Sequence, residues 1–166
     1  MFTKLYIAND HRGYAAKTKL LSYLDEKGVQ YEDLGCDGEE TRRYPYYAAR
    51  ALTKVLADPG SGGVLICSTG IGMSIFANKF KGIRASLCTD GYMARMTRMH
   101  NNSNCLCLGG RVSGEFAIQD IVDRWLEAEY EGGRHEITLG LISRAEDEMF
   151  SGKPCSVADV RVEDEI

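Results

Sequence analysis

A thiol stands directly before a glycine-rich turn in the run Cys67-Ser68-Thr69-Gly70-Ile71-Gly72-Met73-Ser74. Glycines let the backbone turn tightly, so several N–H groups can point at one ligand oxygen. The turn lacks the Gly-Lys-Ser/Thr ending of a P-loop, and Ile75 stands where a dinucleotide-binding loop has its third glycine. The run therefore predicts a small oxyanion cradle rather than an ATP or NAD site.

Cys67 has two interpretations at this position. A helix N-terminus favours the thiolate form of a nearby cysteine, which would make Cys67 a base or a nucleophile. The alternative is a buried cysteine that simply ends a strand, and the spacing alone leaves both open.

The histidines of the chain form a second set of candidate groups, since histidine suits proton transfer near neutral pH. All three fall at expected element ends beside Asp, Asn or Arg, in the segments Asp10-His11-Arg12-Gly13, His100-Asn101 and Arg134-His135. Arg111 follows an expected strand and adds a positive charge. Asp10 alone could be an ordinary helix N-cap, but His11 beside it favours a function.

Alternating strand and helix patterns position these groups. The hydrophobic pattern predicts strands over 4–9, 29–34, 64–67, 83–88 and 105–108, and helices over 12–27, 46–56, 73–79, 91–99, 114–130 and 135–150. This order predicts a Rossmann-like α/β fold, a three-layer α/β/α domain with a five-stranded parallel sheet. Ligands of such sheets bind beyond the carboxyl ends of the strands, here after Asn9, Cys67, Cys88 and Leu108.

Length and composition indicate a globular protein. The 166 residues predict one domain over 1–150 and a polar tail over 151–166. With 44% apolar residues, no span of about 20 apolar residues and no signal peptide, no membrane partner is expected. The net charge of −4 argues against a nucleic-acid partner.

The six cysteines are expected to be reduced thiols in a cytoplasmic protein. They are Cys36, Cys67, Cys88, Cys105, Cys107 and Cys155. Cys105 and Cys107 are two apart on a strand and are expected to pack in the core. The chain contains no Cys-x-x-Cys pair, so no metal site is predicted.

These motifs together resemble the ribose/galactose sugar-phosphate isomerase family, over about residues 4 to 145. The matching segments are Asp10-His11, Tyr44-Pro45, 67–75, Ala77-Asn78-Lys79, Gly82-Ile83-Arg84-Ala85, His100-Asn101, Asn104, Gly110-Arg111-Val112 and 130–135.

The resemblance implies an aldose–ketose isomerase of carbohydrate metabolism, acting without metal or organic cofactor through a cis-enediolate. Ribose 5-phosphate and ribulose 5-phosphate of the pentose phosphate pathway are the leading substrates. By position, Cys67 matches the base that moves a proton between C1 and C2, and His100 the acid/base that opens the furanose ring. The implied binding residues are Asp10 and Asn101 for the sugar, the N–H groups of Ser68, Thr69, Gly70, Ile71 and Gly72 for the oxyanion, and His11, Arg111 and Arg134 for the phosphate.

The resemblance also implies a homodimer with shared active sites. Many members of the family are dimers of dimers. The segment from His100 to Arg111 would then reach Cys67 of the other subunit. Four positions depart from the family's usual pattern, namely Arg43, Tyr46, Ser68 and Thr138. They leave open another aldose phosphate, such as allose or galactose 6-phosphate, and a non-catalytic sugar-phosphate binding module. A thiol redox or metal protein is a further class, which would need a partner for Cys67.

Overall fold

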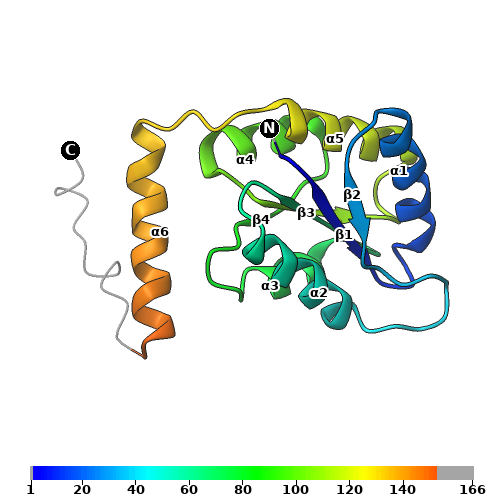
Figure 1. Cartoon of the computed structure of the whole chain (residues 1–166), viewed down its shortest axis with the longest axis horizontal. Coiled ribbons are helices and arrows are strands. Elements are labelled where there is room, and N and C mark those ends of the chain that lie inside the picture. Colours follow the sequence, from blue (N-terminus) through cyan, green and yellow to red (C-terminus); the bar gives the residue numbers. More distant parts are fainter. Residues whose placement is uncertain (1, 153–166) are drawn as a thin grey trace. The chain divides into compact units, whose positions relative to one another are not determined.

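The computed structural model describes residues 2–152, and five parallel strands of this range form one sheet. The strands are β1 (Leu5–Asn9), β2 (Tyr31–Asp33), β3 (Gly62–Cys67), β4 (Ala85–Leu87) and β5 (Cys105–Gly109), in the spatial order β2-β1-β3-β5-β4 (Figure 1). Every residue of β1, β3 and β5 is buried, whereas the short edge strands β2 and β4 are partly exposed. Continuous apolar sequence therefore marks the three central strands, because both faces of a central parallel strand are covered.

Helices cover both faces of this sheet. They are α1 (Tyr14–Glu26), α2 (Tyr44–Ala57), α3 (Ile71–Ala77), α4 (Gly91–Asn101) and α5 (Glu115–Glu127). One buried cluster joins the sheet to α1, α4 and α5, and a second joins it to α2 and α3 (Figure 1). The predicted three-layer α/β/α architecture is confirmed.

The strand order makes the carboxyl end of β3 a topological switch point of the sheet. The helices that follow β1 and β5, α1 and α5, lie on one face, while α3, which follows β3, lies on the other. The chain thus diverges on both sides of the carboxyl end of β3, and such switch points are where parallel sheets bind ligands. Cys67 is the last residue of β3.

Three helix starts differ by two residues from the predicted ones: α2 begins at Tyr44 rather than at 46, and α3 and α1 differ for local reasons. Helix α3 begins at Ile71 rather than at 73, because Gly70 turns the backbone with a φ of +77°. Helix α1 begins at Tyr14 rather than at 12, because Asp10 Oδ1 accepts the N–H groups of Arg12 (2.9 Å) and Gly13 (3.1 Å) and holds this segment in a turn.

The chain divides into two compact units at Tyr130/Glu131. The second contains α6 (Arg134–Phe150), which has no buried residue and exposes Ile137, Met149 and Phe150. A single domain over 1–150 stays a prediction, and most of the predicted tail, 153–166, lies outside the described residues, as does Cys155. No helix within residues 2–152 combines the length and apolar composition that a membrane crossing requires.

Candidate active site

Cys67 lies at the lip of the turn that follows β3. Its side chain is buried, and its Sγ accepts the backbone N–H of Gly70 at 3.1 Å. The left-handed φ of Gly70 bends the backbone back toward the sulfur. The left-handed φ, and a Cβ position only 3.0 Å from the backbone carbonyl carbon of Leu108, favour glycine over any other residue in this turn.

Backbone donors surround this thiol. Among residues 2–152, the structure gives no hydrogen-bond acceptor to the N–H groups of Ser68, Thr69 or Gly72. The carbonyls of the same turn are engaged instead, since Gly110 N–H donates to Cys67 O (2.8 Å) and Arg111 N–H donates to Ser68 O (3.0 Å). A turn with fixed carbonyls and open N–H groups favours an anionic oxygen over a metal ion. Of the five N–H groups of the predicted cradle, these three are open, whereas that of Gly70 bonds to Cys67 Sγ and that of Ile71 to Thr69 Oγ1 at 3.4 Å.

Asp10 and His11 follow the neighbouring strand at the same end as Cys67, because Asn9 of β1 pairs with Ile66 of β3. Asp10 is 7% exposed, and its Oδ1 takes the two backbone donors of the α1 turn. The helix-cap interpretation therefore accounts for Oδ1 and leaves Oδ2 for another donor. Asn9 fixes this corner by donating from Nδ2 to the carbonyl of Asp10 at 2.8 Å.

The ring of His11 contacts the loop that precedes α2. His11 Nδ1 lies 3.2 Å from the backbone N of Arg42 and 3.1 Å from its carbonyl oxygen, so the tautomer of the ring decides which of these two contacts is a hydrogen bond. The loop is thereby drawn to the end of β1, and it brings Arg42 and Arg43 to the edge of the sheet where Cys67 lies. Arg12 and Arg111 are exposed on the other loops of this edge. Of these guanidinium groups, that of Arg42 pairs with Glu40 at 2.7 Å.

His100 and Asn101 lie elsewhere in the same unit. They form the end of α4, which runs back from β4 to the amino end of β5, where Asn104 O accepts the N–H of Gly63. Cys67 is at the opposite end of β3, roughly 13 Å of strand away. Within one chain, His100 and Cys67 therefore lie far apart, whereas the backbone of Arg111 lies beside Ser68. Arg134 begins α6 and is exposed in the second unit, with Thr138 one helical turn further on.

Two residues near the site were not among the predicted site residues. A Cβ on Gly72 would lie 3.0 Å from Cζ of Tyr44, so the Tyr44 ring packs directly on the cradle. Asn9 is completely buried behind Asp10. The Tyr-Pro pair at a helix start, and a single amide at the end of an apolar strand, are the signals that point to them.

The other cysteines have the structural role expected of Cys105 and Cys107. All five cysteines of residues 2–152 are free thiols, and Cys105 and Cys107 are fully buried against α2 and α3. A hydrogen bond with Cys105, then burial, raises the pKa of Cys107, and burial raises the pKa of Cys88 to about 12. Cys88 packs in the cluster on the opposite face, so the end of β4 contributes no thiol to the site.

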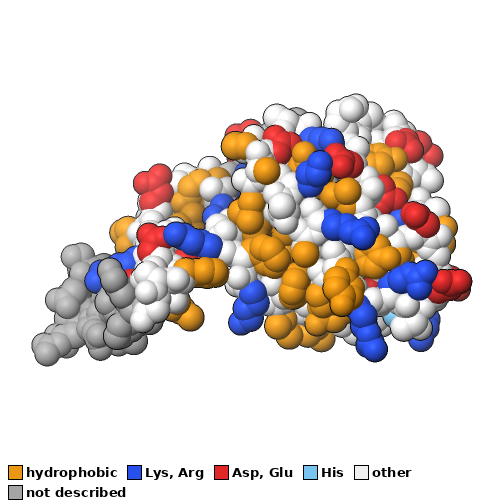
Figure 2. Space-filling view, turned by 60° about the horizontal axis from the view of Figure 1, so that its bottom comes forward, with side chains coloured by type: hydrophobic (Ala, Val, Ile, Leu, Met, Phe, Trp, Pro, Cys, Tyr) orange, Lys and Arg blue, Asp and Glu red, His pale blue; other side chains and the backbone are white. Residues whose placement is uncertain are grey.

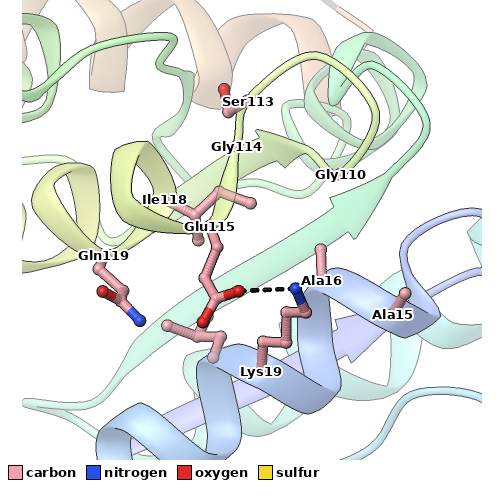
Figure 3. A pocket seen from close by; sticks show the side chains of 10 residues that line it. Ala15, Ala16, Lys19, Gly110, Ser113, Gly114, Glu115, Ile118 and Gln119 are labelled. Carbon is pink, nitrogen blue, oxygen red and sulfur yellow. Dashed lines mark hydrogen bonds and ion pairs between the residues drawn. The ribbon is translucent and has the colours of Figure 1, made fainter.

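A small cavity of about 190 Å³ lies behind the turn that follows β5 (Figure 3). Its walls are largely apolar, with Ala16, Leu20 and Ile118. Its charged groups, Lys19 and Glu115, pair with each other at 2.6 Å. Because these two charges pair with each other, this cavity is poorly suited to a phosphate.

The known proteins that this chain matches share this architecture and most of its length. Residues 5–142 match the family model described as Ribose/Galactose Isomerase. The chain belongs to the ribose/galactose isomerase family. The resemblance drawn from the sequence motifs, and with it the prediction of a sugar isomerase, is confirmed.

Members of this family are similar to the chain in sequence and in structure. Ribose-5-phosphate isomerase B of Escherichia coli is 43% identical over 143 residues, which cover 86% of this chain and 96% of the relative. A ribose-5-phosphate isomerase B structure from Clostridium thermocellum has a TM-score of 0.85 at 43% identity and covers 88% of this chain and 99% of that one. The Mycoplasma genitalium ribose-5-phosphate isomerase B, solved with bound ribulose-5-phosphate, has a TM-score of 0.83 at 35% identity, with 87% and 97% covered.

Proposed function

We propose that this protein interconverts ribose 5-phosphate and ribulose 5-phosphate by proton transfer between C1 and C2. The observation that carries the proposal is the buried Cys67 sulfur beside a turn whose Ser68, Thr69 and Gly72 N–H groups have no acceptor within the described chain. A base next to fixed N–H donors suits a reaction that removes a carbon-bound proton and forms an oxyanion. Relatives named for this activity match along nearly their whole length.

The proposed reaction has two chemical parts. The furanose opens when the C1–O4 bond breaks, the O1 proton leaves and O4 gains a proton, which is the role proposed for His100. The thiolate of Cys67 then takes the C2 proton, the C1 oxygen becomes negative in a cis-enediolate, and the proton returns to C1 as the O2 proton moves to O1. Each well-placed N–H donor on that oxygen contributes about 3 kcal/mol.

The binding roles follow from charge and position. Asp10, with Oδ2 left over from the turn, is proposed to hold sugar hydroxyls, and Asn101 to orient the sugar. His11, Arg111 and Arg134 are proposed to bind the phosphate, since only Nδ1 of His11 is engaged by the Arg42 backbone and the Arg111 and Arg134 side chains are exposed. The open N–H groups of the turn would then be reserved for the reacting oxygen.

We also propose that the active unit is a homodimer with shared sites. One chain separates Cys67 from His100 by the length of β3, so the two side chains meet only if a second copy brings its own His100. Apolar surface for such a contact is exposed on α3, with Ile71 and Ile75, and on α4, with Tyr92; Figure 2 shows hydrophobic side chains gathered on the face of α2 and α3. A groove of about 390 Å³ runs along α4 to Asn101.

The first test is ribulose 5-phosphate formation from ribose 5-phosphate by purified, metal-free protein. Wild type is expected to turn over, and Cys67→Ala is expected to lose turnover while still binding the sugar phosphate, because a base is removed and the phosphate contacts remain. Cys88→Ala, which removes a buried thiol on the opposite face, is the control and keeps its turnover. Loss of binding in Cys67→Ala would contradict the role of a base.

The same assay separates the alternatives. Arg43 and Tyr46 are exposed at the start of α2, beside Tyr44 and the cradle, so this is where another sugar would be selected. Faster turnover of allose or galactose 6-phosphate would assign that substrate instead. Binding without exchange of the C2 proton with solvent would indicate a binding module. The five free thiols support the proposed cytoplasmic location.

A further inference from the structure

Asn102 has an unusual backbone conformation at the end of α4. Among the described residues it is the only one other than glycine with a positive φ, +45°. It ends the helix in a left-handed turn and its N–H donates to Thr97 O. Glycine is the usual residue for such a cap, so an asparagine here calls for a reason beyond ending a helix.

Two guanidinium groups hold this one residue. Arg98 donates from Nη1 to Asn102 Oδ1 and to Ser103 O (3.1 Å), and Arg84 donates from Nε to Asn102 O at 2.9 Å. Arg98 also lies over the ring of Phe2, 4.6 Å from its centroid. Burial, and then the charge of Arg84, lower the pKa of Arg98, so bringing these two cations together is itself unfavourable.

The residues after Asn102 are fixed as well. Trp125 donates from Nε1 to Ser103 Oγ at 2.8 Å in the core. Asn104 accepts the N–H of Arg84 at 2.8 Å and donates to Gly82 O at 2.9 Å. Because the residues on either side of Asn102 are hydrogen-bonded, Arg98 before it and Ser103 and Asn104 after it, the last turn of α4 has little freedom to rotate.

We propose that Arg98, Asn102 and Arg84 form a clamp that positions the imidazole of His100 for opening the sugar ring. His100 lies in the last turn of α4, two residues before Asn102, so a rotation of that turn moves its ring. The inference rests on the proposed function, in which His100 acts on the ring and Cys67 acts on C1 and C2. The clamp therefore matters for ring opening and has no role in the carbon-to-carbon proton transfer.

The substrates themselves separate these two steps. Ribose 5-phosphate closes a furanose through O4, so it must open before it reacts. Ribulose 5-phosphate cannot close the corresponding ring, because its O5 carries the phosphate. Exchange of the C1 protons of ribulose 5-phosphate with solvent therefore needs the base and the cradle alone.

The decisive variant is Asn102→Gly, which removes the Oδ1 acceptor and suits the left-handed backbone, so the fold is kept. Its kcat for ribose 5-phosphate is expected to fall at least about tenfold, with KM and the solvent exchange of ribulose 5-phosphate unchanged. Asn102→Asp keeps an oxygen that accepts from Arg98, so this variant is expected to retain turnover that Asn102→Gly loses. Arg98→Met is expected to resemble Asn102→Gly, while Arg95→Met, the same change on an exposed side of the helix, is the control.

Two outcomes would overturn the clamp. Unchanged ribose 5-phosphate turnover in Asn102→Gly would show that His100 needs no such support, and an equal fall in turnover and exchange would indicate a purely structural role. A second measurement, which does not depend on enzyme activity, follows the histidine ring signals by NMR. The chain has only three histidines, so the spectrum is simple. Asn102→Gly is expected to shift the His100 signals and leave those of His11; if wild type fails to isomerise, this arm still tests the clamp.

Discussion

Gly70 meets two requirements that an L side chain cannot meet together. Its φ is +77°, and a Cβ would lie 2.5 Å from Leu87 Cδ1. Gly70→Ala is expected to lose about 1–3 kcal/mol of unfolding free energy and most turnover, because the N–H moves away from Cys67 Sγ. Urea unfolding and ribose 5-phosphate kinetics measure the two effects.

Gly28 supplies the matched control for this prediction. Its φ is +68°, but a Cβ there meets nothing within 4 Å. Gly28→Ala therefore has the backbone strain without the steric clash and far from Cys67, and it should keep normal turnover. Equal kinetic losses in the two variants would refute a special role for Gly70.

Residue types at strand ends indicated where the site lies, whereas the role of each residue was implied by the family resemblance. Asp10 and Cys67 follow apolar runs, and parallel strands bring their carboxyl ends to one edge, so their proximity follows from the pattern. Tyr44 and Asn102 act through partners distant in sequence, Gly72 and Arg84. Their roles depend on tertiary contacts that no local spacing encodes.

Helix α1 contains a lysine that is almost completely buried. Lys17 Nζ donates to Asp33 Oδ2 (2.7 Å) and to Cys36 O (3.0 Å), which ties α1 to β2 and the loop after it. Lys17→Met is expected to lower the unfolding free energy by about 3 kcal/mol, because a partly buried Asp33 loses its counter-ion. Lys4→Met, at the more exposed pair with Glu32, should have little effect. Equal urea midpoints for the two variants would contradict this difference.

Element types were predictable where burial dictates sequence. The run Val64–Cys67 lacks alternation because β3 is covered on both faces, and the structure adds Gly62 and Gly63 to it. The edge strand β4 is three residues rather than the predicted six, since Ile83 N–H bonds to Phe80 in a turn and Cys88 lies beyond the strand. Apolar residues in a tight turn look like strand residues in sequence.

At the scale of the molecule, the proposed sharing of the site between two subunits leads to a complementation prediction. Cys67→Ala and His100→Ala are each expected to be inactive alone. Co-expressed, they form heterodimers in which one of two sites has both groups, so random pairing restores about a quarter of wild-type activity. Differently tagged chains and a ribulose 5-phosphate assay measure it. Heterodimers without activity would contradict shared sites.

The stability of the fold should decline in alkali. Burial raises the pKa of Cys88 from 9.0 to about 12, so between these values the unfolded chain binds fewer protons than the folded one and unfolding becomes easier as pH rises. Cys88→Ala removes this contribution of the Cys88 thiol to the pH dependence of stability. Its stability relative to wild type is expected to improve by about 2 kcal/mol from pH 7 to pH 10.5, measured by urea unfolding. A pH-independent difference would contradict it.

Strand order was beyond the sequence. Alternating elements predict a parallel sheet, but β5 lies between β3 and β4 because Gly63 and Cys105 pair across more than forty residues. The same long-range pairing decides that His100 ends up at the edge opposite Cys67. In the sequence, nothing distinguishes the motif around Cys67 from the one around His100 as parts of one site. The fold places them at opposite edges of the sheet.

That separation has a kinetic consequence for the shared site. If the sites are shared as proposed, a lone chain holds two halves of different sites and no whole one. Well below the dissociation constant of the dimer, whole sites form in proportion to the square of the protein concentration, so the reaction becomes second order in enzyme. Diluting the enzyme then lowers its specific activity, and a substrate that bridges the two halves raises it again by holding the subunits together.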